Sequence, residues 1–156
     1  MATNNNYKEY TVKVYNNRTE WYLNGKCHRE DGPAIERADG TKRWYLNDNL
    51  HREDGPAIEW ADGTKEWWLN GKRHREDGPA IEWADGTKYW YLNDNRHRED
   101  GPAIEYADGD KAWWLKDKNY SEAQWKKEIA KIKMKNSCNG KIVEIDGKKY
   151  KLVETN

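Results

Sequence analysis

The chain has 156 residues, of which 35% are hydrophobic and 36% are charged, and its 28 Lys and Arg side chains balance 28 Asp and Glu side chains. A hydrophobic fraction below the usual range of about 45–50% disfavours a compact globule and favours a thin fold with a large surface. Because the opposite charges are interspersed and cancel, the sequence lacks the basic field that binding to nucleic acid requires. We therefore expect no nucleic-acid partner, sequence-specific or otherwise.

Residues 1–10 form a polar N-terminal tail, and no stretch approaches the roughly 20 apolar residues of a membrane-spanning helix. The two cysteines, Cys27 and Cys138, are not part of a Cys-x-x-Cys motif. Unrelated cysteines of this kind are typical of reduced thiols, so we expect a cytoplasmic protein.

A unit of 23 residues recurs four times, at 28–50, 51–73, 74–96 and 97–119. Each copy opens with His-Arg-Glu-Asp-Gly-Pro-Ala-Ile-Glu and continues, after one variable residue, with Ala-Asp-Gly, a Lys, a Trp, an aromatic residue and a Leu. A fixed period of about 20–50 residues indicates an array in which each unit buries its apolar surface against its neighbours. A partial copy comes first, and we place the whole array at 11–118. In that partial copy, Val12 and Trp21 align with Ile35 and Trp44.

The dipeptide Asp62-Gly63 lies between two strand-like segments and predicts a hairpin with a two-residue loop. That loop would place Ile58 directly opposite Trp67 and on the same face, with Trp68 on the other face. The recurrence of this pair predicts a largely buried apolar spine. Its members are Trp44, Trp67, Trp90 and Trp113.

A second turn follows the Leu of each unit, and a Gly-Pro dipeptide then leads the chain into the next unit. The predicted fold is therefore all-β. It is an elongated meander of repeated β-hairpins in a single twisted sheet, forming an open solenoid-like array. The second turns fall at Asn24-Gly25, Asn47-Asp48, Asn70-Gly71 and Asn93-Asp94.

Residues 119–156 are predicted to cap the C-terminal end of the array, since the last unit exposes its core. Ser121 and Gln124 form a capping box that predicts a helix over about 122–135, and a hairpin is predicted over about 141–154. A Lys-rich amphipathic helix can also bind a membrane surface. This helix has few apolar anchors, however, and we expect no membrane partner. The anchors are Trp125, Ile129 and Ile132.

The 23-residue period, the Asp-Gly hairpin and the segment Trp-Tyr-Leu-Asn-Gly-Lys-Cys-His at 21–28, ahead of Gly-Pro, together resemble the MORN-type repeats, especially divergent bacterial and phage variants. The resemblance covers about two-thirds of the chain. It implies hairpins aligned in one elongated twisted sheet, in proteins that serve as scaffolds, lipid-binding surfaces or partners of other proteins. Typical MORN units carry more glycines, where this chain has His-Arg-Glu-Asp. The association of such arrays with phage and mobile-element genomes suggests a small viral accessory protein in the host cytoplasm.

The His and Arg residues that open each unit recur at one repeat position and are predicted to form a structural turn ladder. Four equal copies along a rod lack the single pocket of differently placed groups that catalysis uses, so we expect no catalytic residues. Successive His side chains about 10 Å apart cannot converge on one metal ion, so we expect no metal and no cofactor. The ladder consists of His28, His51, His74, His97, Arg29, Arg52, Arg75 and Arg98.

Two variable columns of the repeat are rich in aromatic residues and form the candidate binding site, which we call the aromatic stripe. Trp, Tyr and Arg dominate the binding energy of many protein interfaces, so the stripe predicts a non-enzymatic module that binds and modulates another protein. The alternative is capture of a small nucleotide-like ligand between rings and basic groups. We expect Lys42, Lys65, Lys88 and Lys111 to flank the rings. The stripe consists of Arg37, Trp60, Trp83 and Tyr106 in one column, and Tyr45, Trp68, Tyr91 and Trp114 in the other.

Overall fold

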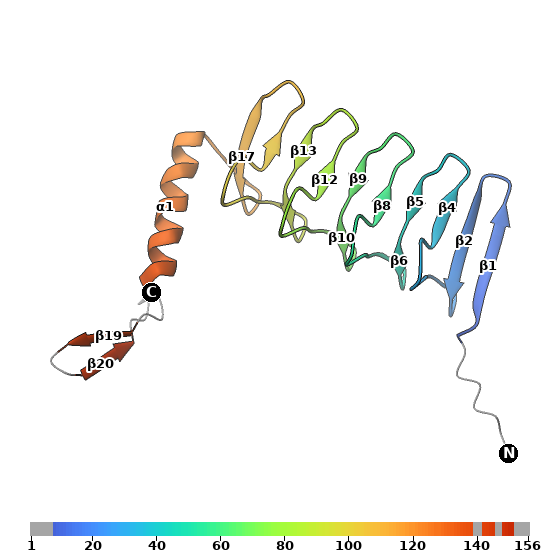
Figure 1. Cartoon of the computed structure of the whole chain (residues 1–156), viewed down its shortest axis with the longest axis horizontal. Helices are drawn as coiled ribbons and strands as arrows, with labels where there is room; N and C mark the ends of the chain where they lie inside the picture. The colour runs from blue at the N-terminus through green and yellow to red at the C-terminus, as the bar shows by residue number, and fades with distance from the viewer. Residues whose placement is uncertain (1–7, 139–141, 146–147, 152–156) are drawn as a thin grey trace, which may run out of the picture.

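The computed structural model describes residues 8–138, 142–145 and 148–151. It confirms the predicted all-β meander, because β-hairpins stand side by side in one long antiparallel sheet, followed by a single C-terminal helix (Figure 1). The expected N-terminal tail at 1–10 falls mostly outside the described residues, and the first strand begins at Tyr10.

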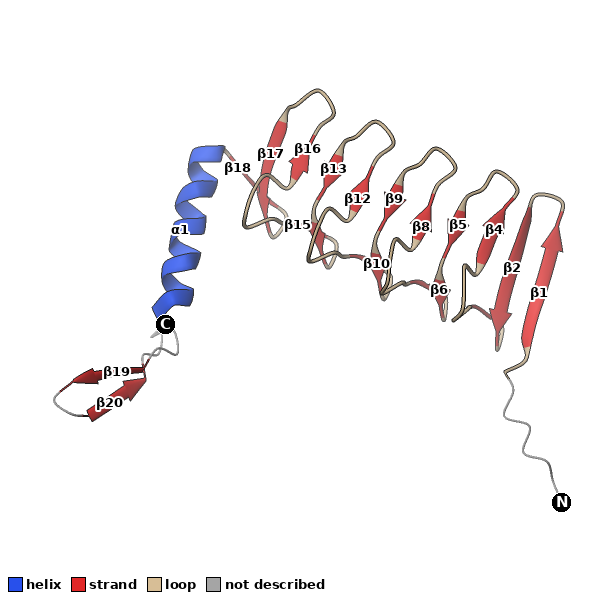
Figure 2. Cartoon of the chain, viewed as in Figure 1, coloured by secondary structure: helices blue, strands red, loops and turns tan. Residues whose placement is uncertain are grey.

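The long sheet is built from one hairpin per unit, and each hairpin pairs with those of the neighbouring units (Figure 2). Its strands are β1 (Tyr10–Tyr15), β2 (Arg18–Leu23), β4 (Ile35–Arg37), β5 (Lys42–Arg43), β8 (Ile58–Glu59), β9 (Lys65–Glu66), β12 (Ile81–Glu82), β13 (Lys88–Tyr89), β16 (Ile104–Glu105), β17 (Lys111–Leu115) and β18 (Lys118–Tyr120), with β3 (Lys26–Cys27) paired to β2.

Short second hairpins extend from the other end of each unit. They are β6 (Tyr45–Leu46) with β7 (Asn49–Leu50), β10 (Trp68–Leu69) with β11 (Lys72–Arg73), and β14 (Tyr91–Leu92) with β15 (Asn95–Arg96). Their tight turns need two residues with positive φ, which Asn and Gly adopt at little cost, as at Asn70 (51°) and Gly71 (77°). At the last unit the same conformation is imposed on Lys116 (50°) and Asp117 (63°).

The first hairpin turn of each unit differs from the prediction by one residue. Ile58 pairs with Glu66 and not with Trp67, because the loop contains Ala61, Asp62 and Gly63. The Gly63 N–H donates to the Trp60 carbonyl, and Gly63 alone in this loop has a positive φ, of 95°. This is the geometry of a three-residue hairpin loop with a glycine bulge, which Asp-Gly supports as well as it supports a two-residue loop.

This one-residue shift moves every side chain of the second strand to the opposite face of the sheet. Glu66 and Trp68 share a face with Ile58 and Trp60, whereas Trp67 lies on the other face. The predicted Ile–Trp spine is therefore wrong. Its Trp residues are half-buried. Arginine guanidinium groups cover Trp44, Trp67 and Trp90 in place of isoleucine, and Trp125 packs against Trp113.

Successive units are joined by hydrogen bonds that recur at the same repeat positions. The Trp67 N–H donates to the Ala80 carbonyl at 2.8 Å, and the Arg52 N–H donates to the Trp68 carbonyl at 3.1 Å. The buried Thr64 hydroxyl accepts a hydrogen bond from the Ala84 N–H at 3.1 Å. These bonds make the array continuous, although few of its apolar side chains are buried. The core consists of Ala34, Ala57, Ile58, Ala80, Ile81, Ala103 and Ile104.

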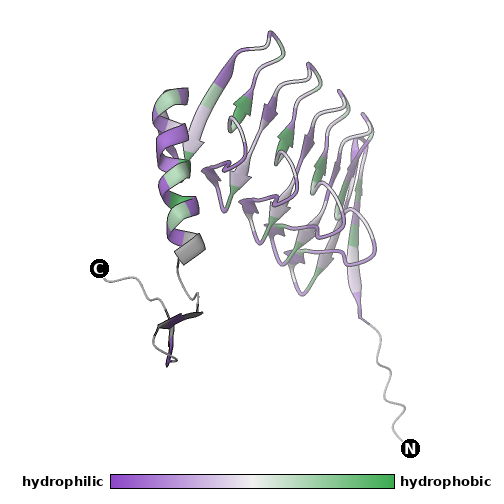
Figure 3. Ribbon diagram, turned by 60° about the vertical axis from the view of Figure 1, so that its left-hand side comes forward, coloured by the Kyte–Doolittle hydropathy of each residue, from purple (hydrophilic) through white to green (hydrophobic). Residues whose placement is uncertain are grey.

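The C-terminal helix α1 (Glu122–Cys138) covers the open end of the last unit. Its capping box forms as predicted, since the Gln124 N–H donates to Ser121 Oγ and the Ser121 N–H donates to Gln124 Oε1. Figure 3 shows hydrophilic and hydrophobic residues alternating along α1, as expected of a helix with one packed side. The packed side places Trp125 and Ile129 against Leu115.

The helix extends beyond the predicted end at Lys135, and a hairpin follows it. This hairpin consists of β19 (Ile142–Ile145) and β20 (Lys148–Lys151). The predicted limits of the hairpin, 141 and 152–154, lie outside the described residues.

Candidate functional site

At each position of the turn ladder, the arginine side chain holds its own loop together by hydrogen bonds. Arg75 Nε donates to Asp77 at 3.0 Å, and Arg75 Nη1 donates to the Pro79 carbonyl at 3.2 Å and to Glu82 at 3.0 Å. The plane of the guanidinium lies over the Trp67 ring, with Cζ 4.0 Å from the ring centroid. The other copies repeat this arrangement with Arg29 over Trp21, Arg52 over Trp44 and Arg98 over Trp90.

The glycine of each loop leaves the space that this arginine needs. A Cβ atom on Gly78 would lie 2.8 Å from Arg75 Cζ, closer than real contacts allow. The guanidinium is thus enclosed between a glycine on one side and a tryptophan on the other. The sequence Arg-Glu-Asp-Gly-Pro therefore encodes a loop that folds around its own cation.

The histidines of the ladder fix the second turn of their unit. His74 Nδ1 lies 3.3 Å from the Asn93 backbone nitrogen and 3.1 Å from Asn93 Oδ1, while its Nε2 lies 3.7 Å from Glu76. His97 Nδ1 accepts a hydrogen bond from the Lys116 N–H. The structure thus places these His side chains in turn contacts, in agreement with the role expected for the ladder.

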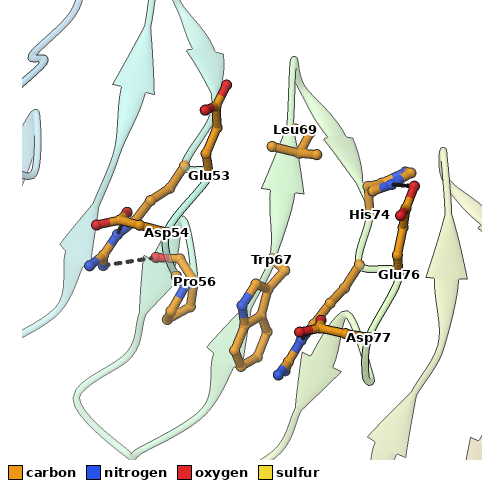
Figure 4. Close-up of a pocket in the computed structure, with 11 residues that line it drawn as sticks. Glu53, Asp54, Pro56, Trp67, Leu69, His74, Glu76 and Asp77 are labelled. Atoms are coloured by element: carbon orange, nitrogen blue, oxygen red, sulfur yellow. Dashed lines mark hydrogen bonds and ion pairs between the residues drawn. The ribbon is translucent and has the colours of Figure 1, made fainter.

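Three equivalent grooves separate successive ladder loops, and we call them the ladder grooves. They hold about 800, 500 and 570 Å³ in chain order. Figure 4 shows the middle groove, with Trp67 and Leu69 between the loop that carries Asp54 and Pro56 and the loop that carries His74. The floors of the other two are Trp44 with Leu46, and Trp90 with Leu92.

The exposed charges of the ladder grooves are negative. The side chains of Glu53 and Glu76 are 84% and 86% exposed, whereas the guanidinium of each ladder arginine is largely covered. The Arg52 guanidinium hydrogen-bonded to Asp54 holds the pKa of that carboxyl below its ordinary value. The grooves therefore combine an apolar floor with carboxylates at the rim.

The aromatic stripe lies on the opposite face of the sheet and is one connected network along much of the array. The indole N–H groups of Trp60 and Trp68 donate to the two oxygens of Glu66, at 2.8 and 3.0 Å. Arg43 covers the Trp60 ring, with its Cζ 4.8 Å from the ring centroid. In the first part of the stripe, the rings of Trp60 and Trp68 are thus already engaged by other side chains of the protein.

The second part of the stripe is more open. Tyr89 packs edge-to-face against Trp83 and Tyr106, with ring centroids 6.4 and 6.2 Å apart, and tilts against Tyr91 at 6.4 Å. Trp83 and Tyr106 are 46% and 40% exposed. This tyrosine-centred cluster thus places two exposed aromatic rings side by side with Tyr89.

The other stripe residues are less involved in this network. Trp114 lies under the guanidinium of Arg96, with Cζ 3.5 Å from its ring centroid, at the end of the array. Within the described part of the chain, no ring contact joins Arg37 or Tyr45 to the other stripe residues, and Arg37 is exposed.

The expectation of flanking lysines is wrong, and arginines take that role. Lys65 lies opposite Glu59 and Glu82 of the two adjacent strands, on the face that carries the ladder. The cations that lie over rings of the stripe are Arg43, Arg73 and Arg96. Sequence reasoning also missed Glu66 and the floors of the ladder grooves, because both depend on the register of the hairpin.

The residues that the structure describes contain no group of three or more His, Cys, Asp or Glu side chains placed to hold a metal ion. No helix within the same residues has the length and apolar character needed to cross a membrane. In comparisons with known proteins, no family model, curated protein or solved structure matches the chain.

Proposed function

We propose that this chain is a non-enzymatic repeat scaffold that binds another protein through the aromatic stripe. The observation that carries the proposal is the cluster of Tyr89, Trp83 and Tyr106, which leaves two large rings close to half exposed on an open sheet face. Exposed, contiguous aromatic surface of this kind is typical of protein interfaces. The resemblance of the repeats to phage-encoded arrays extends the proposal to a host protein as the partner.

The test is affinity capture from a bacterial lysate with the intact chain and with two variants. The variant Trp83→Ala, Tyr106→Ala removes the exposed rings, and Lys65→Ala is the control on the opposite face, where the side chain is also exposed. We expect a specific partner to be lost from the first variant and retained by the second. Retention of every captured protein by the Trp83→Ala, Tyr106→Ala variant would contradict the proposal.

A small anionic ligand of the nucleotide type is the second candidate, and one observation favours it. The Arg73 guanidinium lies over Trp68 and Tyr91, with Cζ 5.0 and 5.3 Å from the ring centroids. Its Nε atom is buried without a hydrogen-bond partner. A guanidinium beside two rings suits a phosphate attached to a stacked base.

Thermal unfolding in the presence of nucleotides distinguishes the two candidates. A ligand at 100 times its Kd stabilises the folded protein by about 2.7 kcal/mol, which raises the melting temperature by several degrees. A shift that disappears in Arg73→Gln would support the ligand. No shift with any nucleotide would eliminate this candidate and leave the protein partner.

A further inference from the structure

The ladder face carries a second set of sites, and the two ends of the array show what these sites accept. At the N-terminal end, Lys8 Nζ lies 2.6 Å from Glu30 Oε2 and also contacts Oε1, so a lysine bridges both oxygens of the first ladder glutamate. This contact lowers the pKa of the Glu30 carboxyl. Glu53 and Glu76, at the same repeat position, stand free of any lysine among the described residues.

At the C-terminal end, helix α1 fills the position that corresponds to a ladder groove. Trp113 and Leu115 are the equivalents of the groove floor, and Trp125 and Ile129 pack on them. Leu115 is only 6% exposed, whereas its counterparts in the three grooves remain half-buried. The floor of a ladder groove therefore accepts apolar side chains.

A backbone acceptor in each groove also lacks a partner. Trp125 Nε1 donates to the Arg98 carbonyl at 3.1 Å, at the C-terminal end. Among the described residues, the equivalent carbonyl groups of Arg29, Arg52 and Arg75 accept no hydrogen bond. A bound segment can therefore meet three features in each groove, namely an apolar floor, an acceptor carbonyl and an exposed carboxylate of Glu53 or Glu76.

The spacing of the grooves restricts the conformation of such a segment. Successive grooves are two strands apart, which is about 9.6 Å at about 4.8 Å per strand. A polyproline II helix rises about 9.3 Å per turn of three residues, so that every third side chain faces the same way. Two turns of an α-helix rise about 10.8 Å, and extended β-strand side chains on one face recur at about 6.6 Å. The polyproline II repeat matches the array best.

We propose that the three ladder grooves bind a basic, proline-rich segment in polyproline II conformation, with Lys or Arg at every third position. Each cationic side chain lies with its stem on the Trp and Leu floor and its charged group at the exposed carboxylates of the ladder glutamates, the group that Lys8 contacts at Glu30. The intervening prolines contact the aromatic floor, as in other proteins that recognise this conformation. This surface is separate from the aromatic stripe and does not depend on it.

The test compares two synthetic peptides of identical composition by isothermal titration with the full chain. One contains four repeats of Lys-Pro-Pro, and the other has its lysines in adjacent pairs separated by runs of four prolines. We expect the evenly spaced peptide to bind at least tenfold more tightly, and its affinity to fall as the salt concentration rises. Equal affinities, or no binding of either peptide, would overturn the proposal.

Variants on the two faces locate the binding surface. The variant Glu53→Lys, Glu76→Lys reverses two exposed charges. Among the described contacts, each of these glutamates faces only the histidine of its own loop. The melting curve of the variant verifies that it folds. We expect it to lose at least tenfold in affinity for the spaced peptide, whereas Trp83→Ala, Tyr106→Ala should bind unchanged. Unchanged affinity in the charge-reversed variant, or loss of affinity only in the stripe variant, would contradict the assignment to the grooves.

Discussion

Trp125 of the C-terminal helix packs against Trp113 with the ring centroids 4.6 Å apart and the ring planes tilted by 48°, at the position where Arg75 covers Trp67 inside the array. The last unit has Ser121 where an arginine would continue the ladder. The helix therefore supplies an indole in place of the missing guanidinium. The C-terminal cap thus covers the last tryptophan of the array at the position where a further unit would place its arginine.

Removal of this cap contact should destabilise the protein. Trp125 is buried between Trp113 and Leu115, so Trp125→Ala should lower the free energy of unfolding by about 3–5 kcal/mol. Lys133→Ala, on the exposed side of the same helix, is the control and should change it by less than about 0.5 kcal/mol. Urea unfolding measures both, and similar losses for the two variants would contradict the assignment of the cap.

The turn at Lys116 is expected to be strained. Its φ of 50° lies in the left-handed region, where the corresponding residues of the other units are asparagines, including Asn70 at 51°. Lys116→Asn should therefore stabilise the protein by about 1 kcal/mol. Asn70→Lys is the matched reverse change and should destabilise by a similar amount. A lower melting temperature for Lys116→Asn would show that the lysine makes a compensating contact.

Much of the architecture follows from the sequence because the unit repeats. Asn-Gly and Asn-Asp specify the second turns, and Ser121 with Gln124 specifies the start of the helix. The register of the first hairpin does not follow, since Asp62-Gly63 fits both a two-residue and a three-residue loop. The hydrogen bond from the Thr64 N–H to Asp62 Oδ1 belongs to the longer loop, and Thr recurs at that position in three of the four units.

The ladder loops were predicted only in outline. The arginine was predicted to belong to a structural turn, but its position over Trp67 depends on how the second hairpin folds back. The signal in the sequence is the constant separation of Trp and Arg, as in Trp67 and Arg75, which fails only at Ser121. The ladder grooves could not be predicted from the sequence, because their walls come from two units and their floor depends on the register of the first hairpin.

The thiol of Cys27 should be unreactive at neutral pH. Burial, with smaller contributions from Asp48 and Glu20, raises its pKa to about 11. In a Cys138→Ser variant, alkylation by iodoacetamide should therefore be slow at pH 8 and should accelerate as the pH approaches 11. The same protein in urea should react like an ordinary thiol. Equally fast alkylation of the folded and unfolded protein at pH 8 would refute the raised pKa.

Acid should weaken the ladder. Paired guanidinium groups hold the pKa values of Asp31, Asp54 and Asp100 below their ordinary value of 3.8. The unfolded chain then binds protons at higher pH than the folded chain, so the stabilisation is present above about pH 4 and is lost as the pH falls through the folded pKa values. Melting temperatures between pH 7 and pH 2 should therefore fall steeply below pH 4. Replacement of the three Asp residues by Asn should flatten this dependence, and an unaltered steep fall would contradict the pairing.

A double-mutant cycle between Arg75 and Gly78 shows whether each loop of the ladder encloses its own arginine. Gly78→Ala places a Cβ against the guanidinium, so alone it should destabilise the protein by about 1–3 kcal/mol. In the background of Arg75→Ala, which removes the guanidinium, the same change should cost almost nothing. Urea unfolding of the four proteins should therefore give a coupling energy between about 1 and 3 kcal/mol. Additive losses would show that the glycine and the arginine act independently, which would contradict the enclosure of the guanidinium by its own loop.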